Sequence, residues 1–517
     1  MSTDSQKKSI DGIQSHEGSI VDLPPDPDAH LSPEEKVEMD RRLVRKLDWI
    51  LIPWLCVLYL IAFLDRSSIG NAKIAGLSDD IGMSTADYNA TLTIFFVSYS
   101  VFEPLTNVML KRMRPSVFIP IIMYERNFRQ PIIWLKKADN VSRIAWGASM
   151  TGMGFVHNWS GLMAARWFLG VTEAGLFPGV NYYLSCWYKR SELGVRAAVF
   201  FSAAALSGSF GGLLAAAIEK MDGLGDIAGW GWIFILEGLL TIVLGVASFW
   251  LVHDFPDKAK FLSDDDRARV IRRLKLDQQS SADHESFQMS YFWAAIRDWK
   301  MWLGMLIYMG CDMPLYAFSL FLPSIIANLG WNTSVIRSQL MSVPPYAVAT
   351  VFTVAIGLLA DRTRARGLCN ICISLFGVAG FAMLLASEDP AVQYAGTFLA
   401  ALGIYPCIAN TISWVANNVE GVYKRGVVLG FVIGWGNLNG VVSSNIYFNK
   451  PRYLEGHGVV MAYLFFFLFG GSVLMSMLLR RENAKRRRGE RNHWIVGLTD
   501  KEIARLGDMR PDFLYTV

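Results

Sequence analysis

An apolar run at residues 339–360 ends in the sequence Gly357-Leu-Leu-Ala-Asp361-Arg362-Thr-Arg-Ala-Arg366, where charges abruptly replace apolar side chains. A run of about 20 apolar residues is long enough to cross a bilayer as a helix. Basic residues directly after such a run indicate the cytoplasmic side of the membrane. The same succession of apolar run and charged loop recurs along the chain, and it decides the fold class.

The composition agrees with a membrane protein. The chain has 517 residues, of which 52% are hydrophobic and only 18% are charged, and its mean hydropathy is +0.30. Soluble domains carry about 25% charged residues. These values exclude a disordered protein and an ordinary soluble enzyme, and six cysteines in or beside apolar runs do not suggest a disulfide scaffold. We expect an all-α polytopic membrane protein.

The apolar runs predict twelve transmembrane helices in two halves of six. The spans expected in the first half are 48–65, 89–110, a third near 117–157, 159–184, 196–218 and 229–252. Those expected in the second half are 299–328, 339–360, 368–386, 392–415, 427–448 and 459–479. The domain limits that follow are a tail at 1–47, a first half at 48–252, a central loop at 253–296, a second half at 297–480 and a tail at 481–517.

Basic clusters alternate with loops that are poor in Lys and Arg. This alternation places both tails and the central loop in the cytoplasm. The sequons at Asn158 and Asn332 then fall on the opposite side, as candidate glycosylation sites. Within the central loop, acids that follow Ser263 and basic residues at Arg272 and Arg273 predict a surface helix lying under the membrane.

The third span is interrupted by charge. Seven charged residues lie between the apolar stretches at 115–122 and 144–157, and neither stretch alone reaches about 20 residues. Removing residues 123–143 would leave a good span. One interpretation is therefore that 123–143 are a translated intron, and the other is a genuine enlarged cytoplasmic loop with a short third span. Sequencing cDNA across residues 115–158 would decide between them.

Ionisable groups inside apolar runs are costly to bury and therefore indicate function. In the fourth span, Arg166, Gly170 and Glu173 stand at i, i+4 and i+7 and share one helix face. A carboxylate near an arginine can alternate between a paired and a protonated state, as a proton-coupled carrier requires. The alternative is a permanent salt bridge that holds two helices together.

Arg66 and Asp312 are further candidates for the binding site. The planar guanidinium of Arg66, near the outer end of the first span, is suited to a substrate carboxylate. Arg66 could equally pair with Asp65 or extend to the membrane interface. Asp312 in the seventh span has no cationic neighbour in its own span.

Amides and aromatic residues cluster in the tenth and eleventh spans. Such groups can line a polar cavity without the cost of a buried charge, and an aromatic ring can stack on a flat substrate. The candidates for substrate binding are Tyr405, Asn410, Trp414 and Asn437. Hydrogen bonding between helices is the alternative role.

Three stretches of the sequence resemble a known family. Residues 357–366 resemble the loop signature of the major facilitator superfamily. The sequence from Arg166 through Pro178 to Gly179 is similar to its anion:cation symporter branch, and Trp414-Val-Ala-Asn417-Asn418 looks like the fungal allantoate permease group. The resemblance covers about residues 45–480, apart from 123–143.

The resemblance implies proton-coupled uptake of a small organic anion by alternating access, in a fungal plasma membrane. Substrates in the group include allantoate, nicotinate, pantothenate and biotin. By resemblance, Arg66 matches an anion-binding arginine, and Arg166 and Glu173 match a proton-coupling pair. Structural or gating roles are expected for Asp65, Gly170, Pro178, Gly357, Asp361, Arg362 and Arg366.

Other functions fit the sequence less well. Export of a secondary metabolite is the main alternative, but Gly208-Ser-Phe-Gly211-Gly212 lacks the proline of the antiporter motif. A nutrient sensor would usually carry a longer cytoplasmic tail. No nucleophile–base pair, metal cluster or phosphate loop supports an enzyme. We expect no cofactor, no metal and no nucleic-acid partner, and a monomer whose partners are an organic anion, protons and the lipid bilayer.

Overall fold

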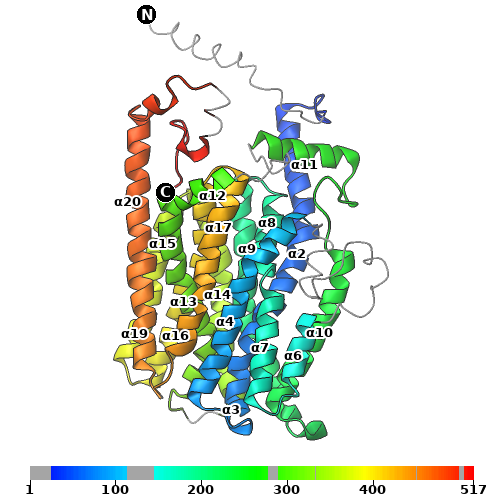
Figure 1. Ribbon diagram of the computed structural model, residues 1–517, viewed down its shortest axis with the longest axis vertical. Coiled ribbons are helices and arrows are strands. Elements are labelled where there is room, and N and C mark those ends of the chain that lie inside the picture. Colours follow the sequence, from blue (N-terminus) through cyan, green and yellow to red (C-terminus); the bar gives the residue numbers. More distant parts are fainter. Residues whose placement is uncertain are drawn as a thin grey trace, which may run out of the picture.

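The computed structural model describes residues 25–112, 145–277, 289–331, 334–449, 451–499, 503 and 506–517. The described chain is helical, with the long helices side by side in one bundle (Figure 1). Nine of the described helices are long and apolar enough to cross a membrane. Large apolar side chains cover the outside of the bundle; Val351, Trp250 and Phe466, for example, are about two thirds exposed or more. An apolar exterior around buried charges is what a lipid solvent requires.

The first half is built from helices that follow the predicted spans. Their bounds are α2 (Pro33–Ile74), α3 (Leu77–Asp80), α4 (Thr85–Arg112), α6 (Ala145–Met153), α7 (Trp159–Glu173), α8 (Leu176–Ser185), α9 (Arg190–Ile218) and α10 (Gly229–Leu251). The predicted fourth span is thus two helices, α7 and α8, separated at Ala174 and Gly175. The proposed insert at 123–143 lies outside the described residues.

The second half repeats this pattern. Its helices are α13 (Trp299–Ala327), α14 (Val335–Thr363), α15 (Arg366–Ala386), α16 (Pro390–Asn417), α17 (Val422–Leu438), α18 (Gly440–Asn445), α19 (Leu454–Ala462), a π-helical stretch (Tyr463–Gly470) and α20 (Gly471–Arg487). The predicted eleventh span is interrupted at Asn439, between α17 and α18. Inside the twelfth, the π-helical stretch joins α19 to α20.

The two halves meet closely along α9 and α14. Near the C-terminal end of α9, a Cβ at Gly212 would lie 2.6 Å from the Gln339 carbonyl oxygen, and about one turn earlier, one at Gly208 would lie 2.7 Å from the Tyr346 ring. Near the N-terminal end of α9, Gly357 of α14 faces Ala198 with no room for a side chain. Small residues allow this approach of two helices in a membrane. The halves are therefore in contact from one end of α9 to the other.

The side of the bundle that the sequence predicts to be cytoplasmic carries additional helices. α11 (Asp264–Leu276) lies across the upper part of α2 in Figure 1, and α12 (Met289–Ile296) follows it. The predicted central-loop helix is confirmed: the Ser263 side chain accepts a hydrogen bond from the Asp266 N–H, and acids occupy the first turn. On α11, Arg269 holds Asp28 at 2.6 Å, and this hydrogen bond keeps the pKa of Asp28 below its usual range.

The first helix begins earlier than expected. α2 starts at Pro33 rather than near residue 48, because Ser32 and Glu35 form a capping box at its N-terminus. At the other end, α20 continues to Arg487, inside the predicted 481–517 tail. Both helices therefore extend past the apolar part of their spans on the side of α11 (Figure 1).

Candidate functional site

The centre of the bundle holds a buried ion pair between α2 and α7. Arg66 donates from Nε and Nη2 to Oε1 of Glu173, at 3.0 and 2.5 Å. The side chains are 7% and 1% exposed. A buried pair of this kind is strongly held because either partner alone would leave an uncompensated charge in a medium of low dielectric constant. Of the alternatives left open for Arg66, pairing with Asp65 and extension to the interface are therefore both wrong.

A chain of hydrogen bonds connects this pair with the second half. Nη1 of Arg66 donates to the Tyr316 hydroxyl at 2.7 Å. That hydroxyl donates to Oδ1 of Asn437 at 2.6 Å, and Nδ2 of Asn437 donates to Oε2 of Glu103 at 2.9 Å. Tyr316 is on α13 and Asn437 on α17, whereas Glu103 belongs to α4. We call these five residues, Glu173, Arg66, Tyr316, Asn437 and Glu103, the central network; it crosses between the halves twice.

Aromatic rings surround the guanidinium of Arg66. Its Cζ lies 4.8 Å from the ring centre of Tyr99, 5.3 Å from that of Phe95, 5.4 Å from that of Tyr316 and 5.8 Å from that of Phe63. Ring faces attract a cation and also exclude water. The cation is thus fixed in place and dehydrated, which strengthens its attraction for a carboxylate.

Arg166 is not the partner of Glu173 that its helix position suggested. It is fully buried, and none of its three guanidinium nitrogens has a hydrogen-bond partner among the described residues. Its Cζ lies 5.1 Å from the centre of the Phe95 ring, the same ring that borders Arg66. Seven helical residues span about 10 Å along the axis, so Arg166 and Glu173 share a face without meeting.

The two aspartates occupy different surroundings. Asp65 points toward α10, where its Oδ2 accepts a hydrogen bond from Thr241 at 2.7 Å. Asp312 lies beside the central network: a Cβ at Gly436, next to Asn437, would lie 2.9 Å from its Oδ2. That oxygen is buried and, within the part of the chain that the structure describes, has no hydrogen-bond partner. Asp312 thus stays a candidate for substrate contact, whereas Asp65 holds α2 against α10.

Two of the three candidates on α16 do not contact the central network. Asn410 bonds Arg366, accepting at 3.1 Å and donating to its carbonyl oxygen at 2.8 Å. The Trp414 indole donates to the carbonyl oxygen of Thr516, in the C-terminal tail, at 2.9 Å. For Asn410 and Trp414 the structure therefore favours the alternative role, hydrogen bonding between elements. The third candidate, Tyr405, packs edge-on against Tyr346 of α14, with 5.9 Å between ring centres.

The loop motif of the second half contacts the first half. Oδ2 of Asp361 accepts a hydrogen bond from the Val195 backbone N–H at 2.8 Å, in the first turns of α9, where the helix dipole favours a negative charge. Asp361 also pairs with Arg366, whereas Arg362 is exposed. This contact joins the halves at the N-terminal end of α9.

The other motif residues lie in or beside α7 and α8. Gly170 allows α7 to pack directly on Ser98 and Phe95 of α4, and Pro178 is buried in α8. Asn158 caps α7 by accepting a hydrogen bond from the Gly161 N–H at 2.7 Å, whereas Asn332 lies outside the described residues.

Sequence reasoning missed Tyr316 and the aromatic residues around Arg66. Tyr316 follows Asp312 by four residues, and Tyr99 precedes Glu103 by four, so each shares a helix face with a buried acid. This spacing was available in the sequence. It becomes informative only once the neighbouring helices are known.

Comparisons with known proteins agree with this geometry. Residues 140–444 match the Major Facilitator Superfamily. An uncharacterized transporter of Schizosaccharomyces pombe is 33% identical and covers 90% of this chain and 89% of its own length. The high-affinity nicotinic acid transporter of Saccharomyces cerevisiae is 31% identical, over 93% of this chain and 86% of its own. The MFS transporter prlL of a fungal species is 34% identical, over 87% and 89%.

Solved structures show the same fold. A bacterial homologue of the human lysosomal transporter Spinster, in an inward-facing and occupied conformation, superposes with a TM-score of 0.58 at 14% identity, over 83% of this chain and 96% of its own. The proton:xylose symporter gives a TM-score of 0.57 at 13% identity, over 80% and 94%. The chain belongs to the major facilitator superfamily: it is a multi-pass membrane transporter and not an enzyme.

Proposed function

We propose that the chain takes up a small organic anion together with protons, by alternating access, and that the anion is a monocarboxylate vitamin or an allantoate-like compound. The observation that carries the proposal is the ion pair of Arg66 and Glu173 at the interface between the halves. An arginine fork already holding a carboxylate can hold the carboxylate of a substrate in the same geometry.

The charges explain how protons and anion would be coupled. In the empty site, Glu173 neutralises Arg66. In the loaded site, the substrate carboxylate takes its place while a proton neutralises Glu173, so the charge of the buried site is unchanged. Binding only the anion or only the proton leaves an uncompensated buried charge, which is strongly unfavourable. Protonation of Glu173 therefore releases Arg66. From the sequence alone, Arg166 was the expected partner, because it lies on the same helix as Glu173.

The relatives guide the choice of substrate. One of them, at 31% identity, is named a high-affinity nicotinic acid transporter, and nicotinate is a small monocarboxylate. A ring of aromatic side chains around Arg66 suits a flat, carboxylate-bearing molecule. A dicarboxylate would need a second arginine for its second carboxylate, and α13, which is the seventh span, contains none.

Uptake into permease-deficient yeast tests the proposal. Labelled nicotinate, pantothenate, biotin and allantoate are supplied at outside pH 5 and pH 7, with and without a protonophore. The chain is expressed with and without residues 123–143. We expect acid-stimulated uptake of one compound that the protonophore abolishes. No uptake by protein present at the cell surface would contradict the proposal and favour export, which efflux from preloaded cells measures directly.

A further inference from the structure

The cytoplasmic end of α20 carries a dense positive charge. Residues 480–491 contain seven basic residues and two acidic ones. The two acids are already paired: Glu482 with Arg491 at 2.7 Å and Arg486 at 3.5 Å, and Glu490 with Arg488 at 3.0 Å. Within the described chain no ion pair is formed by Arg480 or Arg487, and both are exposed.

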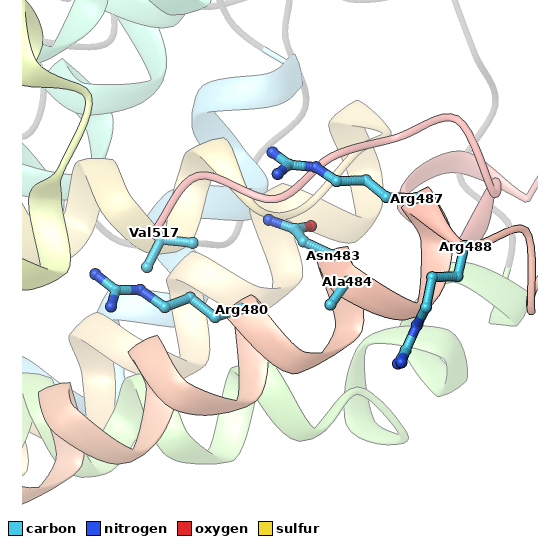
Figure 2. A pocket seen from close by; sticks show the side chains of 6 residues that line it. All are labelled: Arg480, Asn483, Ala484, Arg487, Arg488 and Val517. Carbon is cyan, nitrogen blue, oxygen red and sulfur yellow. The ribbon is translucent and has the colours of Figure 1, made fainter.

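A cavity of about 460 Å³ lies between α20 and the C-terminal tail. It is lined by Arg480, Asn483, Ala484, Arg487, Arg488 and Val517 (Figure 2). Four of these residues are on α20 and Arg488 is its C-cap. They are spaced at i, i+3, i+4, i+7 and i+8 and so belong to one face of the helix. Figure 2 shows Arg480 and Arg487 on the part of this face beside the tail residue Val517.

The wall formed by the tail is firmly attached. Asn483 and Tyr515 exchange two hydrogen bonds of 2.8 Å, from Nδ2 to the carbonyl oxygen and from the backbone N–H to Oδ1. Nη2 of Arg486 donates to the Tyr515 hydroxyl at 2.7 Å. The tail is thus held against α20 independently of Arg480 and Arg487, and these two arginines are left over for a ligand.

The cavity begins at the polar layer of the membrane and extends slightly beyond it. Arg480 is the first charged residue after the apolar part of α20. At 1.5 Å per residue, Arg487 lies about 10 Å farther along the helix, whereas the polar headgroup layer of one leaflet is roughly 5–8 Å thick. A ligand that touches both arginines must therefore reach from the level of the lipid phosphate past the outer edge of an ordinary headgroup. α20 stands at the edge of the bundle, where lipid has access (Figure 1).

We propose that this cavity binds the phosphorylated inositol headgroup of a lipid in the cytoplasmic leaflet. The phosphate that links the lipid to its headgroup would lie at Arg480, and a phosphate on the inositol ring at Arg487. Arginine forks hold phosphate oxygens in a bidentate manner, and basic clusters directly cytoplasmic of a transmembrane helix attract anionic lipids. A headgroup without a ring phosphate does not span the two arginines.

The test uses the purified full-length chain in detergent and four probes. These are a short-chain phosphatidylinositol bisphosphate, phosphatidylserine, phosphatidylcholine and free inositol trisphosphate, with dissociation constants measured by microscale thermophoresis. Arg480→Gln combined with Arg487→Gln is compared with Arg481→Gln, since Arg481 is also exposed but lies about 100° around the helix and does not line the cavity.

We expect the bisphosphate lipid to bind at least tenfold more tightly than phosphatidylserine. The double variant should lose this preference, because each arginine that is removed should raise the dissociation constant for the bisphosphate lipid about fivefold. Arg481→Gln should change affinity by less than twofold. Equal binding of both anionic lipids, or equal losses in the double variant and Arg481→Gln, would overturn the proposal in favour of unspecific charge attraction. If free inositol trisphosphate binds as tightly as the bisphosphate lipid, the proposal that the ligand is a lipid is overturned. Unchanged melting curves of the variants without lipid verify that they are folded.

Discussion

Replacing Glu173 with Gln separates proton coupling from substrate binding. Gln keeps the size of the side chain and an oxygen that accepts from Arg66, but it carries no charge at any pH. The empty site then contains the Arg66 cation without its buried partner, whereas the site loaded with an anion remains neutral. We therefore expect the loaded carrier to cross normally and the empty carrier to return slowly.

The magnitude follows from the burial of this pair. Both side chains are less than a tenth exposed, and breaking a buried pair by removing one charge costs about 3–5 kcal/mol. Such a cost slows the return of the empty carrier by more than a hundredfold, since about 1.4 kcal/mol corresponds to a factor of ten. With outside pH two units below the cytosol, one proton per monovalent anion supports accumulation of about a hundredfold. In Glu173→Gln this accumulation should fall to equilibration.

Two assays on the same cells measure the two effects. The first follows accumulation of the labelled substrate at outside pH 5, and the second follows exchange of label into cells preloaded with unlabelled substrate. Glu455→Gln is the matched control, because Glu455 is an exposed carboxylate in the first turn of α19, outside the central network. Wild-type accumulation by Glu173→Gln would refute the coupling role, and loss of exchange together with accumulation would show that Glu173 is needed for binding as well.

Two further perturbations concern the contacts between elements. Tyr316→Phe removes the hydroxyl that links Arg66 to Asn437 and should weaken the closed contact between the halves by about 1–3 kcal/mol. A cysteine introduced beside the central network should then react faster with a thiol reagent in Tyr316→Phe than in the wild type. An unchanged rate of labelling would contradict the prediction. Asp508→Asn removes a carboxylate that contacts Lys300 at 2.6 Å and should lower the melting temperature by several degrees at pH 7. Burial alone raises the pKa of Asp508, but Lys300 and Lys424, which both contact its carboxylate, hold that pKa below its usual range. Its stabilisation is therefore complete at neutral pH and is lost as the pH falls through the lowered pKa, so the melting temperatures of variant and wild type should converge in strong acid.

The spans were predictable because a bilayer imposes one length on every helix. The run at 299–328, for instance, is α13, Trp299–Ala327. The start of α2 at Pro33 was missed because that part of the helix lies outside the apolar run, although Ser32 and Glu35 are a capping signal that the sequence contains. The third span cannot be compared between 123 and 143, which lie outside the described residues.

The site was predictable as a set of residues and not as a set of contacts. A charge in an apolar run marks Arg66, Arg166 and Glu173, but the partner of each depends on which helices are neighbours. Helical periodicity favoured the pair within one helix, whereas the structure joins Glu173 to Arg66 from another helix. The same limitation affected Asn410, whose partner Arg366 is 44 residues away.

The contact of the Tyr346 ring with the bare backbone of Gly208 also has a mechanical consequence. It lies between a tight contact toward the C-terminal end of α9, at Gly212, and another toward its N-terminal end, at Gly357. If the two halves tilt, one end contact must separate while the other closes, and the middle contact moves least. The Tyr346 ring thus marks the point about which the two halves tilt. A side chain introduced at Gly208 would collide with this ring and should slow opening toward either side of the membrane equally, without altering which substrate is carried.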